Sequence, residues 1–96
     1  MPAIVRVNAD AHQGHAGPNV PFHQTYYAAG SPTVFVNNEQ AVRKGDKTLC
    51  GDVASGASSN VFINGILVHR KGDSTSGHGG WLPNSASTGS ANVFAN

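Results

Sequence analysis

Three copies of one short block run through the chain and constrain its fold more than any other feature. Residues 34–37 (Val-Phe-Val-Asn) return as residues 61–64 (Val-Phe-Ile-Asn) and as residues 93–96 (Val-Phe-Ala-Asn), each with a serine three residues before it. Residues 42–46 (Val-Arg-Lys-Gly-Asp) return as residues 69–73 (His-Arg-Lys-Gly-Asp). One unit of this size cannot bury its apolar face alone. The repeats therefore predict one closed object with approximate threefold symmetry.

Length and charge narrow the possible classes. The 96 residues predict a single domain over residues 1–96 with a small core. The net charge of +1 does not indicate binding to nucleic acid or to an anionic membrane. The apolar runs are too short to span a bilayer, and no secretory signal is expected. A single cysteine excludes an internal disulfide, so a structural metal is one of the few available ways to stabilise so small a core.

The local pattern is that of short hairpins. Glycine or proline interrupts almost every window, so no long helix is expected. Residues 33–36 and 60–63 are rich in β-branched and aromatic residues and predict strands. Asn-Asn and Asn-Gly follow these strands as turns, and the return strands are predicted at residues 40–44 and 66–71. The fold class is therefore all-β.

The two ends of the chain complete the pattern. Residues 2–6 (Pro-Ala-Ile-Val-Arg) resemble a return strand without a partner, and residues 93–96 resemble an outgoing strand without a return. We expect these two segments to pair with each other. The pairing would close the ring and make a third hairpin.

Three loops follow three aspartate-containing turns, and equivalent points of these loops carry side chains that bind soft or borderline metals. These residues are His15, Cys50 and His78, which follow Asp10, Asp46 and Asp73. Equivalent points of a closed threefold unit converge on its axis. Imidazole and thiolate are the donors that a tetrahedral zinc site prefers.

The fourth ligand must break the symmetry. His23 is the first choice because it lies in the longest loop, and His12 and His69 are the reserves. The alternative interpretation is that the histidines are surface residues and that Cys50 is a small buried apolar residue. Because three of these residues occupy equivalent positions in the three loops, we favour the interpretation that they bind a metal.

Catalysis is not expected. A catalytic zinc needs an open coordination position and a nearby general base, and three of the five carboxylates are accounted for as turn residues. No His-Glu-x-x-His motif and no nucleophile elbow is present in the sequence. The pairs Arg43-Lys44 and Arg70-Lys71 are expected to be solvated strand residues. Trp81 is expected either to cover a small core or to form an exposed patch with Leu82 and Pro83.

The blocks together resemble a known family. They comprise residues 30–37, 41–46, 50–51, 59–65, 68–73 and 77–79. In order and spacing they are similar to the PAAR-repeat proteins, which form the sharp tip of a trimeric spike. The Pro-Ala-Ala-Arg tetrapeptide that names the family is not intact, since residues 40–43 (Gln-Ala-Val-Arg) and 67–70 (Leu-Val-His-Arg) stand in its place.

The resemblance implies a small cone with a metal near its tip. The implied metal is a structural zinc ion bound by three histidines and one cysteine, which by position are His15, His23, Cys50 and His78, with iron as the alternative metal. The broad base is expected to cap the blunt end of a trimeric β-helical spike as one monomer on a trimer. The cone would sharpen the spike for piercing the target envelope when the sheath contracts.

The resemblance also implies a location and an alternative. The expected location is the central spike of a phage tail baseplate, as a virion structural protein, or a type VI secretion spike assembled in the cytoplasm and exported on firing. Members from secretion systems often carry effector domains, and none is expected here, so we expect a phage tail tip or a bare tip for a secretion spike. The alternative is a stand-alone module that binds carbohydrate or envelope through exposed aromatic residues, for which Trp81, Tyr26 and Tyr27 are the candidates.

Overall fold

Short strands, turns and loops make up the whole fold. The computed structural model describes residues 2–96, and among these residues no helix is present, so none is long and apolar enough to cross a membrane. The all-β class predicted from the sequence is confirmed. The strands are β1 (His15–Gly17), β2 (Val20–His23), β3 (Phe35–Val36), β4 (Glu39–Gln40), β5 (Phe62–Ile63), β6 (Ile66–Leu67), β7 (Ser74–Thr75) and β8 (Asn84–Ser85).

Two hairpins repeat one design. Strands β3 and β4 pair antiparallel with Phe35 opposite Gln40, and β5 and β6 pair in the same register with Phe62 opposite Leu67. The turn residues 37–38 and 64–65 all have positive φ angles, between 52° and 75°. A two-residue turn of this kind needs asparagine or glycine, which explains the repeated Asn-Asn and Asn-Gly pairs.

The termini form the third hairpin, as the sequence predicted. Ala3 pairs antiparallel with Phe94, which stands where Phe35 and Phe62 stand in the other two hairpins. The amide of Ile4 donates to the carbonyl of Val93 at 3.0 Å. The chain therefore closes on itself.

The strands are shorter than the sequence predicts, because each return segment leaves its own hairpin after two residues and pairs with the next unit. The bridges that join the units are Ile4 with Arg70, Arg6 with Ala41, and Arg43 with Val68. Next to these bridges, three backbone hydrogen bonds join one residue of each unit into a closed ring. Val5 N–H donates to His69 O at 3.2 Å, His69 N–H to Val42 O at 3.0 Å, and Val42 N–H to Val5 O at 2.9 Å.

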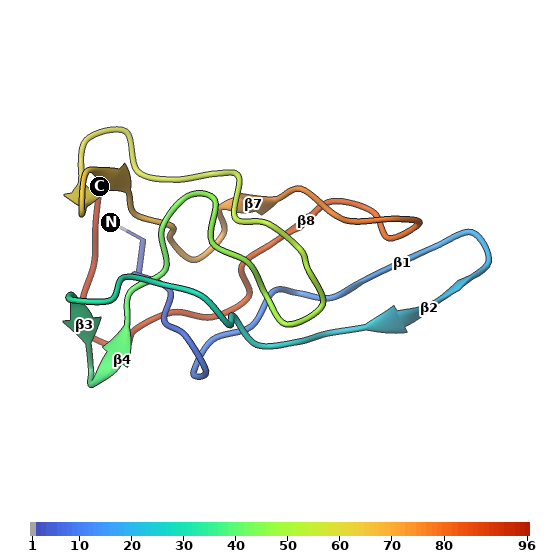
Figure 1. Ribbon diagram of the computed structural model, residues 1–96, viewed down its shortest axis with the longest axis horizontal. Coiled ribbons are helices and arrows are strands. Elements are labelled where there is room, and N and C mark those ends of the chain that lie inside the picture. Colours follow the sequence, from blue (N-terminus) through green and yellow to red (C-terminus); the bar gives the residue numbers. More distant parts are fainter. Residues whose placement is uncertain (1) are drawn as a thin grey trace.

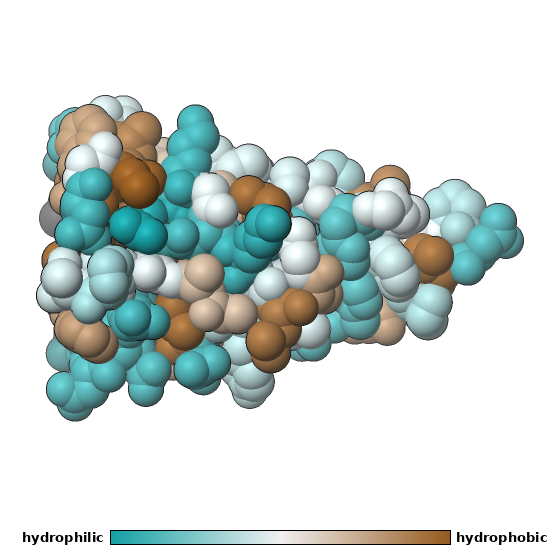
Figure 2. All heavy atoms as spheres, viewed as in Figure 1, coloured by the Kyte–Doolittle hydropathy of each residue, from teal (hydrophilic) through white to brown (hydrophobic). Residues whose placement is uncertain are grey.

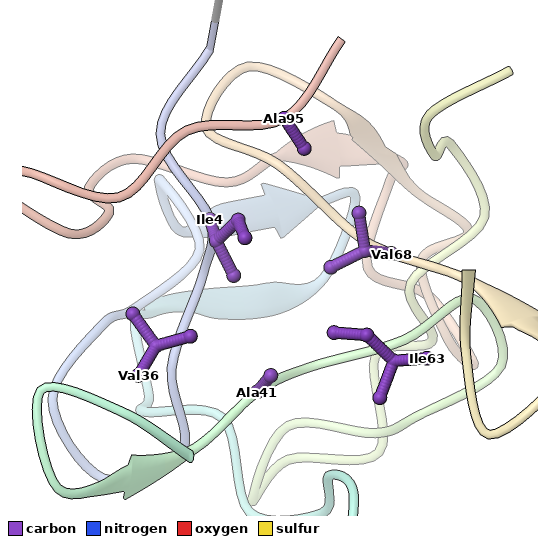
Figure 3. Packing of buried hydrophobic residues seen from close by; sticks show 6 residues of the cluster. All are labelled: Ile4, Val36, Ala41, Ile63, Val68 and Ala95. Carbon is purple, nitrogen blue, oxygen red and sulfur yellow. The ribbon is translucent and has the colours of Figure 1, made fainter. Parts of the chain in front are cut away.

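The hydrophobic core is layered along the same axis. The layer near the base takes two small or branched residues from each unit, as Figure 3 shows: Ile4, Val36, Ala41, Ile63, Val68 and Ala95. The next layer toward the tip contains Val5, Val7, Tyr27, Val42, Ala54 and Ala86. The phenylalanines of the repeats take no part in these layers, because their side chains face the solvent.

Each unit ends in an arginine–aspartate turn. In the third unit, Asp73 Oδ2 accepts the backbone N–H of Arg70 and its Nε–H, both at 2.8 Å, and Asp73 Oδ1 accepts Nη2–H at 2.9 Å. The same pairing joins Arg6 to Asp10 and Arg43 to Asp46. The expectation of solvated Arg-Lys pairs was wrong for Arg43 and Arg70, whose side chains are only 15% and 18% exposed, whereas both lysines of these pairs are exposed.

The molecule tapers from the hairpin end to a narrow tip. Its principal extents are 38, 24 and 21 Å, and Figures 1 and 2 show the broad end with β3 and β4 and the narrow end beyond β1 and β2. The tip consists of the β1–β2 hairpin and the loop between β7 and β8. The backbone amide of Leu82 donates to Ala16 O at 3.3 Å, which joins the two parts. A Cβ added to Gly17 would lie 1.9 Å from Gly80 O, so the two backbones approach more closely than any side chain would permit.

Candidate metal centre

Four side chains from the three loops meet in the tip half of the cone. His15 comes from β1, His23 from β2, Cys50 from the turn after Thr48, and His78 from the loop between β7 and β8. One ligand atom of each of these residues lies within 4.8 Å of the others. The structure thus brings together all four residues that the sequence predicts as ligands, in a group that could hold a metal ion.

The three histidines present the same ring nitrogen to one point. His15 Nε2 lies 2.7 Å from His23 Nε2 and 3.1 Å from His78 Nε2, and His23 and His78 are also 3.1 Å apart through these atoms. Cys50 Sγ lies 3.8 Å from His15 Nε2. An imidazole nitrogen donates or accepts along one direction, so three nitrogens in a triangle cannot all be satisfied by one another. A cation among them satisfies all three lone pairs, and the donor set fits a metal.

The hydrogen bond on the side of the His15 ring away from the centre determines which of its two nitrogens faces the centre. His15 Nδ1 lies 2.7 Å from Leu82 O, a carbonyl that can only accept. The side-chain amide of Asn84 also lies near Nδ1, but it donates its two hydrogens to Asp52 Oδ2 at 2.8 Å and Thr75 Oγ1 at 2.7 Å. His15 Nδ1 therefore carries the proton and Nε2 keeps its lone pair for the centre, as metal-binding histidines require.

His12, the first reserve ligand, is engaged elsewhere. Its Nε2 accepts the backbone N–H of Thr25 at 3.0 Å, and its Nδ1–H then donates to Asn84 Oδ1 at 3.0 Å. The ring is completely buried, and burial lowers the pKa of His12. Both nitrogens have partners in the protein, although Nε2 lies only 3.5 Å from Cys50 Sγ.

His69, the second reserve, belongs to the core. It stands at the position that valine takes in the other two units, fully buried, with Nδ1–H donating to Gly56 O at 2.7 Å and Nε2 accepting the hydroxyl of Tyr27 at 2.8 Å. Burial lowers the pKa of His69 and raises that of Tyr27. The pair fills the axis of the second layer without an unsatisfied polar atom.

A buried carboxylate lies behind the histidines. Asp52 is fully buried, its Oδ1 accepts the Gly77 amide at 2.7 Å, and its Oδ2 lies 3.7 Å from His12 Nδ1 and 3.9 Å from His15 Nδ1. The group of His12, His15 and Asp52 is compact enough for a second ion. Both Nδ1 atoms are engaged by other acceptors, and Asp52 Oδ2 instead accepts the side-chain amide of Asn84, whose Oδ1 accepts from His12.

The pKa of His23 is shifted in the direction that favours binding of a cation. Desolvation lowers the pKa of His23, and repulsion from the neighbouring imidazoles of His15 and His78 lowers it further. Metal ligation needs neutral imidazole, so this shift favours the state that binds.

Two features of the centre were missed by sequence reasoning. Asn84 connects His12, Asp52 and Thr75, and nothing in its local sequence marks it. The indole of Trp81 stacks on His23 with ring centroids 4.6 Å apart, so this residue covers the histidines rather than an apolar core. Its position three residues after His78 was the available signal, since a short turn returns the chain to the same place.

Comparison with known proteins identifies the family. The model of the PAAR motif matches residues 9–55, which include His15, His23 and Cys50. No curated protein and no solved structure matches the chain. The PAAR motif family is associated with spike-tip proteins. The matched segment, the three repeated units and the all-β cone together show that the chain is a PAAR-repeat protein.

Proposed function

We propose that this protein is the pointed cap of a trimeric β-helical spike, bound through its broad base, and that the tip is stabilised by one zinc ion. The single observation that carries the proposal is the base, where equivalent positions of three units present Phe35, Phe62 and Phe94 with 57%, 60% and 49% of their surface exposed. Large apolar residues exposed in a repeated pattern mark an interaction surface. One chain with three similar units can make similar contacts with each chain of a trimer.

The chemistry of the centre favours zinc. In a tetrahedral site with Zn–N bonds of about 2.0–2.1 Å, neighbouring nitrogens are about 3.3 Å apart. The separations of 2.7–3.1 Å between the three Nε2 atoms are slightly shorter than this value, and the thiol at 3.8 Å completes a set of three nitrogens and one sulfur. Four protein ligands leave no open coordination position, which is the mark of a structural zinc.

The distribution of charge suits a point that crosses a membrane. The segments that build the tip, residues 15–23 and 74–85, contain no Asp, Glu, Lys or Arg. The one carboxylate nearby, Asp52, is fully buried. Charged side chains are costly in the apolar part of a bilayer, so a tip without them meets a smaller barrier when it is driven through.

The alternative of a carbohydrate- or envelope-binding module has less support. Tyr27 is fully buried and Trp81 lies against the histidines, so only Tyr26, at 54% exposure, remains of the three candidate aromatic residues. A module of this class needs several aromatic rings on one exposed face.

The test is binding to a trimeric β-helical spike. Each half-exposed phenylalanine contributes about 1–2 kcal/mol when it is fully buried. Replacing Phe35, Phe62 and Phe94 together by serine is therefore expected to weaken binding on the order of 100- to 10,000-fold. The matched control replaces Phe22 and Leu82, which are 64% and 58% exposed near the tip, and is expected to bind normally.

Titration calorimetry would measure both affinity and stoichiometry. The proposal predicts one cone per spike trimer. Equal affinity of the base variant and the wild type, with both correctly folded by circular dichroism, would contradict docking through this surface.

A further inference from the structure

The indole of Trp81 lies flat against two of the three histidines. It stacks on His23 at 4.6 Å and 18° between planes and on His78 at 5.0 Å and 25°, and these two imidazoles stack on each other at 5.1 Å and 8°. The three rings are therefore nearly parallel. The indole is half-buried and covers faces of the imidazoles that water would otherwise reach.

A hydrogen bond fixes the indole in this place. Nε1–H of Trp81 donates to Pro21 O, two residues before His23, at 2.7 Å. The backbone of Trp81 pairs antiparallel with His78, with N–O distances of 2.8 and 3.1 Å. Trp81 is thus tied to β2 through its side chain and to the loop between β7 and β8 through its backbone. These are the two arms of the tip in Figure 1.

We propose that Trp81 is a positioning residue of the metal centre, whose indole holds His23 and His78 in place and slows the release of the metal. The proposal rests on the metal binding proposed above. A competing ligand must first displace one imidazole from the metal. With the indole stacked in place, the ring of His23 or His78 can turn away only after the stack and the bond to Pro21 open.

The experiment measures how fast zinc leaves the folded full-length chain when an excess of a chromogenic chelator is added. W81F retains an aromatic ring but loses the bond to Pro21, whereas W81L and W81A lose the stack as well. L49A is the control, because Leu49 is a large exposed residue next to Cys50 in the sequence, with 68% of its surface exposed. Cobalt-loaded samples report in their visible absorption whether the same four ligands remain.

We expect W81A to release zinc on the order of 10- to 100-fold faster than the wild type, as for the loss of other groups that support metal ligands. W81L is expected to be nearly as fast as W81A, W81F to lie between W81L and the wild type, and L49A to match the wild type. The cobalt spectrum is expected to keep its tetrahedral form in each variant.

Two results would overturn the inference. If the wild type holds one zinc and W81A releases it at the wild-type rate, the indole has no part in holding the metal, although the proposed centre stands. Should W81A not fold, release of zinc from W81L at the wild-type rate would lead to the same conclusion. A wild type that binds no stoichiometric metal would overturn the proposed centre itself and this inference with it.

Discussion

Truncating the aspartate of an arginine–aspartate turn should destabilise the cone strongly. Asp73→Ala removes the acceptor of three hydrogen bonds from Arg70, of 2.8 to 2.9 Å, in a pair whose side chains are 18% and 13% exposed. A hydrogen bond to a charged group contributes about 1.5–3 kcal/mol, and loss of one partner of a buried ion pair costs about 3–5 kcal/mol. This pair is partly solvated, so we expect a loss of about 2–4 kcal/mol. In a domain of this size each kcal/mol lowers Tm by about 4–8 °C.

The three turns permit an internal comparison. Asp10 is only 1% exposed and also accepts the hydroxyl of Thr88 at 2.7 Å, whereas the side-chain bonds from Arg43 to Asp46 are longer, at 3.0 and 3.3 Å. Alanine at Asp10 should therefore cost the most, and alanine at Asp46 the least. Calorimetric melting with zinc in excess would measure the series.

A matched control is Lys44→Gln, which changes an exposed charge beside the second turn and should alter stability by less than about 0.5 kcal/mol. Losses for the three aspartate variants as small as that of K44Q would refute the reasoning. So would a larger loss at Asp46 than at Asp10.

Two further predictions concern the core and the tip. Burial lowers the folded-state pKa of His69 below its unfolded value of about 6.5. Between these two pKa values the unfolded chain binds a proton that the folded chain does not bind. The stability that His69 contributes is therefore lost as the pH falls from about 6.5 toward the folded pKa. Replacing His69 by valine together with Tyr27→Phe should flatten the dependence of unfolding free energy on pH in urea titrations between pH 7 and 5, and an unchanged slope would contradict this. Gly17→Ala places a Cβ 1.9 Å from Gly80 O and should separate the two arms of the tip, which would be measured as faster amide exchange at Leu82. The control is Gly65→Ala, at a positive φ but with open space around it, which should leave the tip unchanged.

The repeats allowed much of the fold to be predicted from the sequence. Asn-Asn and Asn-Gly located the two central turns, because few other residues adopt positive φ at both positions. The lone blocks at the two ends correctly indicated that Ala3 and Phe94 pair. What the local pattern could not reveal is the pairing between units, which shortens the strands.

The candidate centre was predicted in part for the same reason. Registration of the loops predicted that His15, Cys50 and His78 converge, and His23 was the first choice for the fourth ligand. What the sequence did not predict is the β1–β2 hairpin that brings His23 to the centre, because this segment was expected to be an irregular loop. That hairpin lacks the β-branched alternation of a strand and contains two prolines, and contacts with the opposite arm stabilise it. The Pro18-Asn19 pair, with Asn19 at a φ of 66°, was the turn signal that could have indicated it.

The most direct test of the metal-stabilised tip is the metal content per chain, measured by elemental mass spectrometry on untagged protein and on Cys50→Ser. We predict one zinc per wild-type chain, and in the variant a large loss of zinc together with a lower Tm. Correctly folded wild-type protein without stoichiometric metal, or a C50S variant that retains both zinc and stability, would contradict the account.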